Sequence, residues 1–292
     1  MLTHSDDSTT LLDEIDFISS VSGGSFTAAY YGLYGDDIFD HFEDDFLYHD
    51  VGGDLLCSDL HSYPVAEAVT ASAAVPIVFN PVVLNNYPYC NPNSQLDLTR
   101  NSGDPQIQRT IDGLRSYQNK QRRPYIHLVD GGISDNLGLL AIFDVVESSG
   151  GNQAFIEKVK TRPRSHLVII SVDASTEPFY GFEQSTKEPS ITDTLSAITD
   201  TQLHRYNDVT KNVIWRNMQE WVELSKDDDI MTDPYFIHIT LKKIPNPTTR
   251  FEANSIPTDF TLSDEDVDLL IKEGERQLLD HPLFHQLLGQ IK

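Results

Sequence analysis

Apolar and polar residues follow one another along the chain in runs that predict alternating strands and helices. Residues 11–21 read as an apolar strand with a polar lead-in, and they run directly into a helix-prone stretch over residues 26–33, which Gly35 ends. The Leu-Val-Ile-Ile run inside residues 166–172 predicts a strand that is buried on both faces. Strict alternation over residues 235–241 predicts a further strand.

Helical spacing and start signals predict four more helices. Three of them cover residues 64–74, 137–146 and 188–213. The fourth begins at Ser263, a predicted N-cap, and extends towards Leu279. Its first turn is acidic, as the positive end of a helix dipole favours.

Three segments between the candidate site motifs have less regular patterns. Pro81 interrupts a predicted strand over residues 77–84, which places that strand at an edge or a bulge. Residues 38–47 have helical spacing, and a surface helix is favoured over a lipid-facing lid. Residues 85–104 are rich in Asn, Pro and Ser and predict a long loop, for which a substrate-side flap is the functional alternative.

The alternation of strand-like and helix-like runs favours an α/β fold. No internal repeat is visible, and a chain of 292 residues can form one large domain or two small ones. We expect a single domain over residues 1–292. Its residues 1–150 carry the candidate site, and residues 151–292 complete the same fold.

Composition and charge narrow the possible partners. The formal net charge of -24 opposes binding to nucleic acid and to anionic lipid, so lipid contact is expected to be apolar or with neutral substrate. No run reaches the roughly 18 apolar residues of a membrane span, and Met1 does not open a signal-peptide pattern. Cys57 and Cys90 do not make a disulfide framework and are expected to be thiols, although they could pair. These features leave the compartment open between cytoplasm and exterior.

The first chemical motif lies around Ser22. An apolar strand ends in a serine between small residues and a helix follows, which is the pattern of a nucleophile elbow. The positions two before and two after the serine must be small, and they are Ser20 and Gly24. The backbone N–H of Gly23 and the positive end of the following helix are then placed to stabilise an oxyanion.

The second chemical motif is Asp130-Gly131-Gly132. It ends a short apolar strand over residues 124–129. A carboxylate at the carboxyl end of a strand lies where open α/β sheets bind their ligands, and glycines permit a sharp turn and close approach. Asp135 and Asn136 are expected to cap the helix that follows.

With a third, small-residue block over residues 68–79, these motifs resemble the patatin-like phospholipases of bacterial type. The resemblance covers residues 11–146 and is looser beyond. It implies a three-layer α/β/α fold with a mostly parallel central sheet. It also implies a lipid acyl hydrolase in which Ser22 is the nucleophile and Asp130 the general base, with an acyl-enzyme intermediate. The expected substrate is a lipid or fatty-acyl ester, with transient membrane contact and neither a cofactor nor a metal.

The sequence departs from that family at two points. Ser20 replaces the first glycine of the elbow, a change that we expect the fold to tolerate. Residues 1–12 contain no glycine, so the family's glycine-rich oxyanion loop is not visible before Ser22, and the first strand of the sheet is expected to be missing. We expect either an incomplete N-terminus, or oxyanion donors from another segment, or a non-catalytic chain that keeps the fold as a lipid- or protein-binding module.

A Ser–His–Asp triad is the rival mechanism. Its chain order would be Ser22, then Asp130 or Asp173, then His204 or His238. No histidine follows an acidic residue in a recognisable motif, so the dyad is favoured. The acidic clusters at residues 44–45 and 227–229 lack the ligand spacing of a calcium loop, and solvated loop charge is the preferred interpretation.

Overall fold

The structure is a computed structural model that describes most of the chain. The described residues are 11–12, 14–35, 65–75, 80–86, 105–117, 119–159, 166–177, 180–225, 234–258 and 262–290. Several predictions lie outside these residues, namely the helix over 38–47, the start of the strand at 77–79, nearly all of the loop over 85–104, both cysteines and both acidic clusters.

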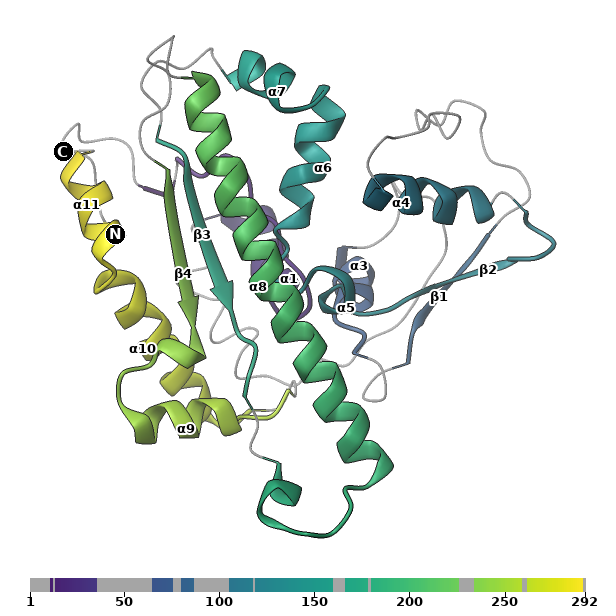
Figure 1. The fold of residues 1–292 in the computed structure, drawn as a ribbon, viewed down its shortest axis with the longest axis vertical. Coiled ribbons are helices and arrows are strands. Elements are labelled where there is room, and N and C mark those ends of the chain that lie inside the picture. Colours follow the sequence, from purple (N-terminus) through teal and green to yellow (C-terminus); the bar gives the residue numbers. More distant parts are fainter. Residues whose placement is uncertain are drawn as a thin grey trace. The chain divides into compact units, whose positions relative to one another are not determined.

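The protein is a mixed α/β chain with short strands in two small sheets (Figure 1). It divides into two compact units, residues 1–52 with 131–292, and residues 53–130. The single domain over residues 1–292 and its three-layer architecture stay predictions.

The larger unit contains a parallel pair of strands and most of the helices. Its elements are α1 (Gly24–Tyr34), α5 (Gly132–Asp135), α6 (Leu140–Ser149), α7 (Asn152–Val159), β3 (Val168–Asp173), α8 (Ile191–Ser225), β4 (Tyr235–Thr240), α9 (Pro247–Ser255), α10 (Asp264–Leu279) and α11 (Pro282–Gln290). Short 3-10 turns cover Gly181–Gln184 and Leu241–Lys243.

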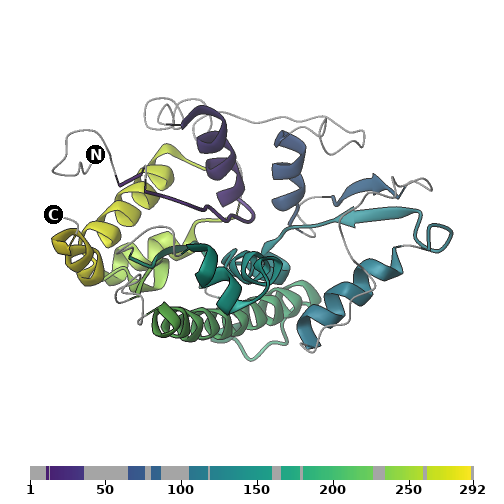
Figure 2. The same cartoon turned by 90° about the horizontal axis from the view of Figure 1, so that it is seen from above.

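The parallel pair β3–β4 lies between helices. Val168 is in register with Tyr235, and Asp173 with Thr240. Helix α8 lies on one side of the pair, and α10 and α11 lie on the other (Figures 1 and 2). Because side chains alternate along a strand, each face of the pair meets a different set of helices.

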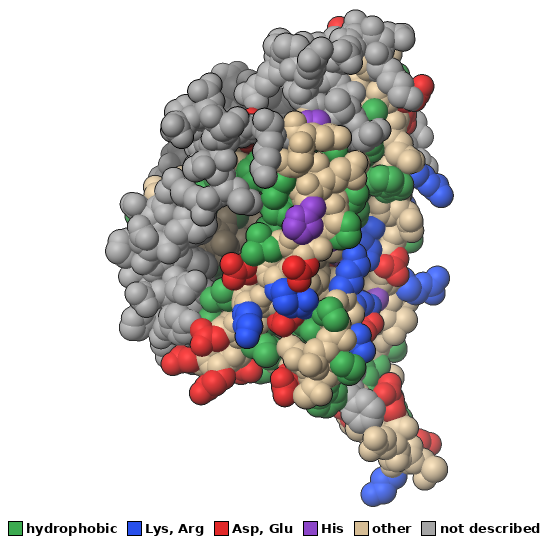
Figure 3. All heavy atoms as spheres, turned by 90° about the vertical axis from the view of Figure 1, so that its left-hand side faces the viewer, with side chains coloured by type: hydrophobic (Ala, Val, Ile, Leu, Met, Phe, Trp, Pro, Cys, Tyr) green, Lys and Arg blue, Asp and Glu red, His purple; other side chains and the backbone are tan. Residues whose placement is uncertain are grey.

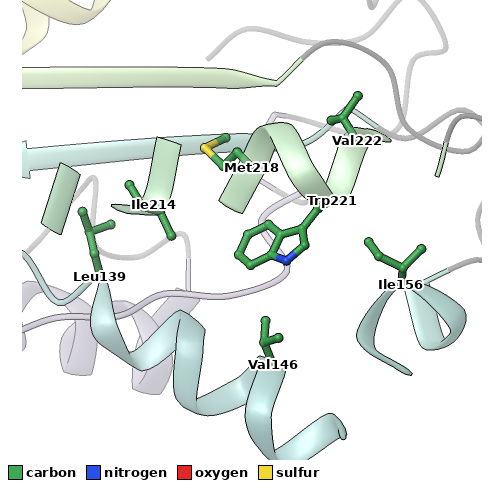
Figure 4. Packing of buried hydrophobic residues seen from close by; sticks show 7 residues of the cluster. All are labelled: Leu139, Val146, Ile156, Ile214, Met218, Trp221 and Val222. Carbon is green, nitrogen blue, oxygen red and sulfur yellow. The ribbon is translucent and has the colours of Figure 1, made fainter. Parts of the chain in front are cut away.

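A buried apolar cluster fixes α8 to the sheet and to α6 and α7. Its members come from these three helices and the turn before α6, and Figure 4 shows them around α8: Leu139, Val146, Ile156, Ile214, Met218, Trp221 and Val222. The Trp221 indole donates a hydrogen bond to Asn152 Oδ1 at 2.9 Å, and its ring centroid lies 5.6 Å from that of Phe155. The buried Trp thus has both apolar packing and a partner for its one donor.

The prediction that β3 is buried on both faces is wrong. Ile170 and Val172 are 47% and 69% exposed, whereas Ser171 and Asp173 are buried. The face with Ile169 packs against the apolar cluster, while the described part of α10 and α11 packs on β4 through Ile237 and Phe284. Only β4 therefore has helices over both of its faces among the described residues.

Several predicted boundaries are confirmed. Helix α1 ends at Gly35, whose N–H donates to the Tyr31 carbonyl and whose φ of 59° favours glycine. Helix α10 starts after Ser263, whose side chain accepts from the Asp266 N–H at 3.2 Å. The strand predicted over residues 11–21 is wrong: residues 15–21 belong to no strand or helix, and residues 11, 12 and 14 lie in turns.

The smaller unit contains α3 (Val65–Ser72), α4 (Pro105–Ser116) and an antiparallel ribbon of β1 (Val82–Asn85) and β2 (Tyr125–Leu128). Val82 pairs with Leu128, and Asn85 with Tyr125. Strand β1 begins directly after Pro81, in agreement with an edge position, because proline has no N–H for a ladder.

Candidate active site

Ser22 has the backbone conformation of a strained turn. Its φ is 52°, and it is the one non-glycine residue with positive φ in the part of the chain that the structure describes. The Gly24 N–H donates to the Val21 carbonyl at 3.2 Å, and the Ser25 N–H to the Ser22 carbonyl at 3.0 Å. A non-glycine residue in this region costs about 1–2 kcal/mol, so the surrounding structure must hold it there. The strained serine and helix α1 follow one another as the elbow pattern predicts, whereas the segment before Ser22 forms no strand among the described residues.

The small residues on both sides of Ser22 lie close together. A Cβ built on Gly24 would lie 4.0 Å from the Cβ of Ser20, which is ordinary van der Waals contact. Larger side chains at both positions would collide across the turn. This spacing gives a physical reason for a residue as small as Ser20 two positions before Ser22.

Gly138 holds the segment that leads into the elbow, and the sequence interpretation did not single it out. The Ser19 hydroxyl donates to the Gly138 carbonyl at 2.6 Å. Gly138 has φ of 64°, and an added Cβ would lie only 2.9 Å from Ser19 Oγ. The approach of the two backbones therefore requires glycine, and it joins the turn after α5 to the residue three before Ser22.

Asp130 lies two residues beyond β2 in a buried position. Its side chain is 6% exposed, and its backbone N–H donates to the Ala74 carbonyl at 2.9 Å. Ala74 belongs to the small-residue block, so two of the three motifs behind the family resemblance are in direct contact. Gly131 and Gly132 follow and begin the single turn of α5. Ser22 and Asp130 belong to different compact units, so the dyad itself stays a prediction.

A polar layer lies between α8 and the carboxyl end of β3. Asp173 Oδ1 accepts from the Ser175 hydroxyl and, at 3.0 Å, from the Ser175 N–H. Ser175 Oγ in turn accepts from the amides of Asn136 at 2.8 Å and Asn207 at 3.2 Å. Asn136 thus anchors the end of the Asp-Gly-Gly turn to β3 and does not cap the next helix. Its neighbour Asp135 does cap α6, since it accepts from the Leu140 N–H at 2.8 Å.

His238 completes this layer from β4 and bears on the rival triad. Its Nε2 lies 3.7 Å from Asp173 Oδ2, and its Nδ1 lies 3.3 Å from Ser171 Oγ. Burial, with nearby Lys211 next in size, lowers the pKa of His238 from its ordinary 6.5 to about 4, although Asp173 opposes the shift. The ring is therefore neutral at pH 7.

His204 is also engaged, because its Nε2 lies 3.1 Å from the Thr176 carbonyl oxygen. The histidine and carboxylate of the rival triad are thus paired through His238 and Asp173, but the serine beside them is Ser171. Since Ser171 is only 4% exposed, this layer is closed to a substrate.

A cavity of about 330 Å³ lies near the start of α8. It is lined by Phe182, Pro189, Thr194, Ala197, Ile198, Thr201 and Gln202. None of these side chains can act as a nucleophile–base pair, so the cavity offers no acid–base chemistry.

Comparisons with models of known protein families, with curated proteins and with solved structures found no match. Within the described residues, no three His, Cys, Asp or Glu side chains are grouped so that they could hold a metal ion. None of the described helices is both long and apolar enough to span a membrane.

Proposed function

We propose that this chain is a lipid acyl hydrolase of the patatin-like type, with Ser22 as nucleophile and Asp130 as general base. The observation that carries the proposal is the positive φ of Ser22 at the turn that leads into helix α1. Strain of this kind persists only where the surroundings fix it, and it is common at functional sites. The buried Asp130 at the end of a strand supplies the second group.

The proposed reaction has two steps. Asp130 accepts the Ser22 hydroxyl proton while Oγ forms a bond to the ester carbonyl carbon, and the alcohol leaves with that proton when the tetrahedral intermediate collapses. Water then attacks the acyl-enzyme and gives its proton to Asp130, and Asp130 returns that proton to Ser22 Oγ as the tetrahedral intermediate collapses and releases the fatty acid. The N–H of Gly23 and the amino end of α1 stabilise the negative oxygen in both steps.

The same proposal includes the finer architecture. In a three-layer α/β/α fold, the parallel pair β3–β4 would belong to the central sheet, with α8 in one outer layer and α10 and α11 in the other. The elbow segment before Ser22 would lie beside that sheet. Cysteine-scanning crosslinks between residues 15–21 and β3 would test that placement.

The direct test is labelling with a fluorophosphonate probe, which reacts only with activated serines. We expect the full chain to be labelled, Ser22→Ala to lose all labelling, and Asp130→Asn to lose at least a hundredfold in rate. Ser255→Ala on the exposed face of α9 is the matched control and should be labelled like the parent chain. Lack of labelling in a folded parent chain would contradict the proposal and favour a non-catalytic, lipid- or protein-binding chain.

A second measurement separates the dyad from the triad. Alanine replacements of His204 and His238 should keep the labelling rate within a few-fold of the parent chain, provided that circular dichroism shows them folded. A thousandfold loss at either position would overturn the dyad.

A further inference from the structure

One segment of the smaller unit carries an excess of positive charge in this acidic chain. Residues 105–129 carry five cationic side chains and one carboxylate, a local charge of +4 in a chain of net charge -24. By contrast, acidic and basic side chains lie side by side on the face of α9, α10 and α11 (Figure 3). There, Arg276 pairs with Glu273 and Asp280.

A buried asparagine gives the basic segment a defined shape. Asn86, 9% exposed, donates from its amide to the carbonyls of Tyr117 and Arg123, each at 2.8 Å. Its side-chain oxygen accepts from Lys120 Nζ, and its backbone N–H donates to the Pro124 carbonyl at 2.8 Å. One residue at the end of β1 thus fixes the loop between α4 and β2. We call residues 117 and 119–124 the basic loop.

Three of the five cations of this region are exposed, while Lys120 and Arg115 are half-buried and pair with Asn86 and Asp112. Arg109, Arg122 and Arg123 are exposed. The Arg123 guanidinium lies 4.7 Å from the centroid of the Tyr117 ring, which orients it. The single carboxylate of the segment, Asp112, pairs with Arg115 at 2.9 Å.

Exposed apolar side chains lie on the ribbon that the basic loop joins. Val83 and Tyr125 are 39% and 54% exposed, and they share one face of the ribbon, since Val83 pairs with His127 and Asn85 with Tyr125. Tyrosine beside aliphatic and cationic side chains is typical of surfaces at the membrane–water boundary, where the ring lies at headgroup level.

We propose that the basic loop and the exposed ribbon face dock on a membrane that contains anionic phospholipids. The cations would contact headgroup phosphates while Val83 and Tyr125 enter the interface. This local surface reverses the expectation that net charge excludes anionic lipid, because salt screens charges farther than about 8–10 Å and leaves the nearest ones dominant. The proposal goes beyond the proposed chemistry and does not depend on it.

The test measures binding of the full chain to sedimented vesicles of phosphatidylcholine with and without phosphatidylserine. The Ser22→Ala background is used throughout, so that hydrolysis cannot alter the vesicles. We expect binding that requires phosphatidylserine and weakens as salt rises. Arg122→Ala/Arg123→Ala should lower the partition coefficient by about 25-fold, or roughly fivefold for each cation.

The matched control is Arg205→Ala/Arg216→Ala, which removes two exposed cations from α8 and should change the partition coefficient less than twofold. An equal fall of the partition coefficient in the two double variants would mean that only net charge matters, and it would overturn the proposal. So would unchanged binding in the loop variant, or binding of the parent chain to pure phosphatidylcholine alone.

Single-stranded RNA is the competing anion. If an RNA oligonucleotide binds tighter than the vesicles, and the loop variant loses that binding, the lipid assignment is wrong. Should Arg122→Ala/Arg123→Ala fail to fold, the salt dependence of the parent chain and the variant Arg122→Gln/Arg123→Gln provide the same decision. Vesicle binding in the Ser22→Ala background is read independently of probe labelling, so the two proposals can fail separately.

Discussion

The contact between α8 and the β3–β4 pair has two halves, one held by apolar packing and the other by buried polar side chains. At the amino end of the strands, Ile214, Met218 and Trp221 bury apolar surface against Ile169 and Phe236. At the carboxyl end, α8 places Asn207 and Thr210 in buried positions. There the sheet presents the polar side chains Asp173, Ser171 and His238.

The difference shows what each half contributes. The apolar half stabilises the fold by removing apolar surface from water, and this contribution does not depend on the exact orientation of the side chains. The polar half gains little net energy, but its groups must keep their partners, since an unmatched buried polar group costs about 1–3 kcal/mol. The apolar half therefore holds the helix, and the polar half fixes the positions of the segments that end there, including the turn after Asp130.

The largest expected effect is at the apolar half. Trp221→Ala should lower the free energy of unfolding by about 3–5 kcal/mol, because it removes a fully buried ring and leaves a cavity. Denaturant titration measures the loss. Trp215→Ala is the control on the same helix, and since Trp215 is 37% exposed its cost should stay below about 1 kcal/mol.

The next largest effect is a pH dependence of stability that arises from His238 in the polar half. The unfolded chain binds a proton at His238 near pH 6.5, whereas the folded chain does so only near pH 4. Unfolding therefore takes up a proton between these values, and stability falls by about 3 kcal/mol as the pH drops from 6.5 to 4. Denaturant titrations across this range should show the slope.

His238→Gln should flatten that part of the curve, and His285→Gln on the exposed face of α11 should leave it unchanged. The same slope in the His238 variant would mean that other groups cause the pH dependence.

A smaller effect is expected at the centre of the hydrogen-bond network. Ser175→Ala removes the acceptor of Asn136 and Asn207 and one donor to Asp173, at a cost of about 2 kcal/mol. The labelling rate at Ser22 should fall as well if Asn136 positions the turn that follows Asp130. Ser196→Ala, exposed on α8, should change neither quantity.

The smallest effect is at the turn before α6. Gly138→Ala forces a Cβ into the left-handed region and against Ser19 Oγ, so we expect a loss of about 1–2 kcal/mol. Gly274→Ala in α10 has open space and a helical backbone, and should instead stabilise the protein by up to about 1 kcal/mol. Thermal unfolding of the two variants should shift in opposite directions.

Local sequence signals predicted where helices and strands begin and end more accurately than they predicted which side chains are buried. Ser263 and Gly35 mark their helix ends because capping involves residues a few positions apart. For α8, the apolar residues that stood out, Ile191, Leu195 and Ile198, are 82%, 50% and 53% exposed. The buried face begins at Asn207, close to where the sequence predicted the helix to end.

The polar layer could not be predicted in the same way. Ser175 meets Asn136 and Asn207 across 39 and 32 residues, and only the packing of α8 on β3 brings them together. A turn at Gly138 could be predicted locally, because a glycine follows Asp135-Asn136-Leu137. Its close contact with Ser19 could not, because Ser19 is distant in the chain. For Ser22 and Asp130, the motifs were visible because backbone turns impose small residues next to them.

Helix α8 has one further consequence. Its 35 residues span about 52 Å, yet all of its buried side chains lie from Asn207 onwards. The first turns thus bury no side chain, and their contacts, such as the hydrogen bond from the Tyr180 hydroxyl to Asp200, are with a short surface turn, so they can open locally without unfolding the core. Amide hydrogens should exchange quickly up to about His204 and slowly near Trp221. One continuous helix would therefore show two segments with different exchange rates.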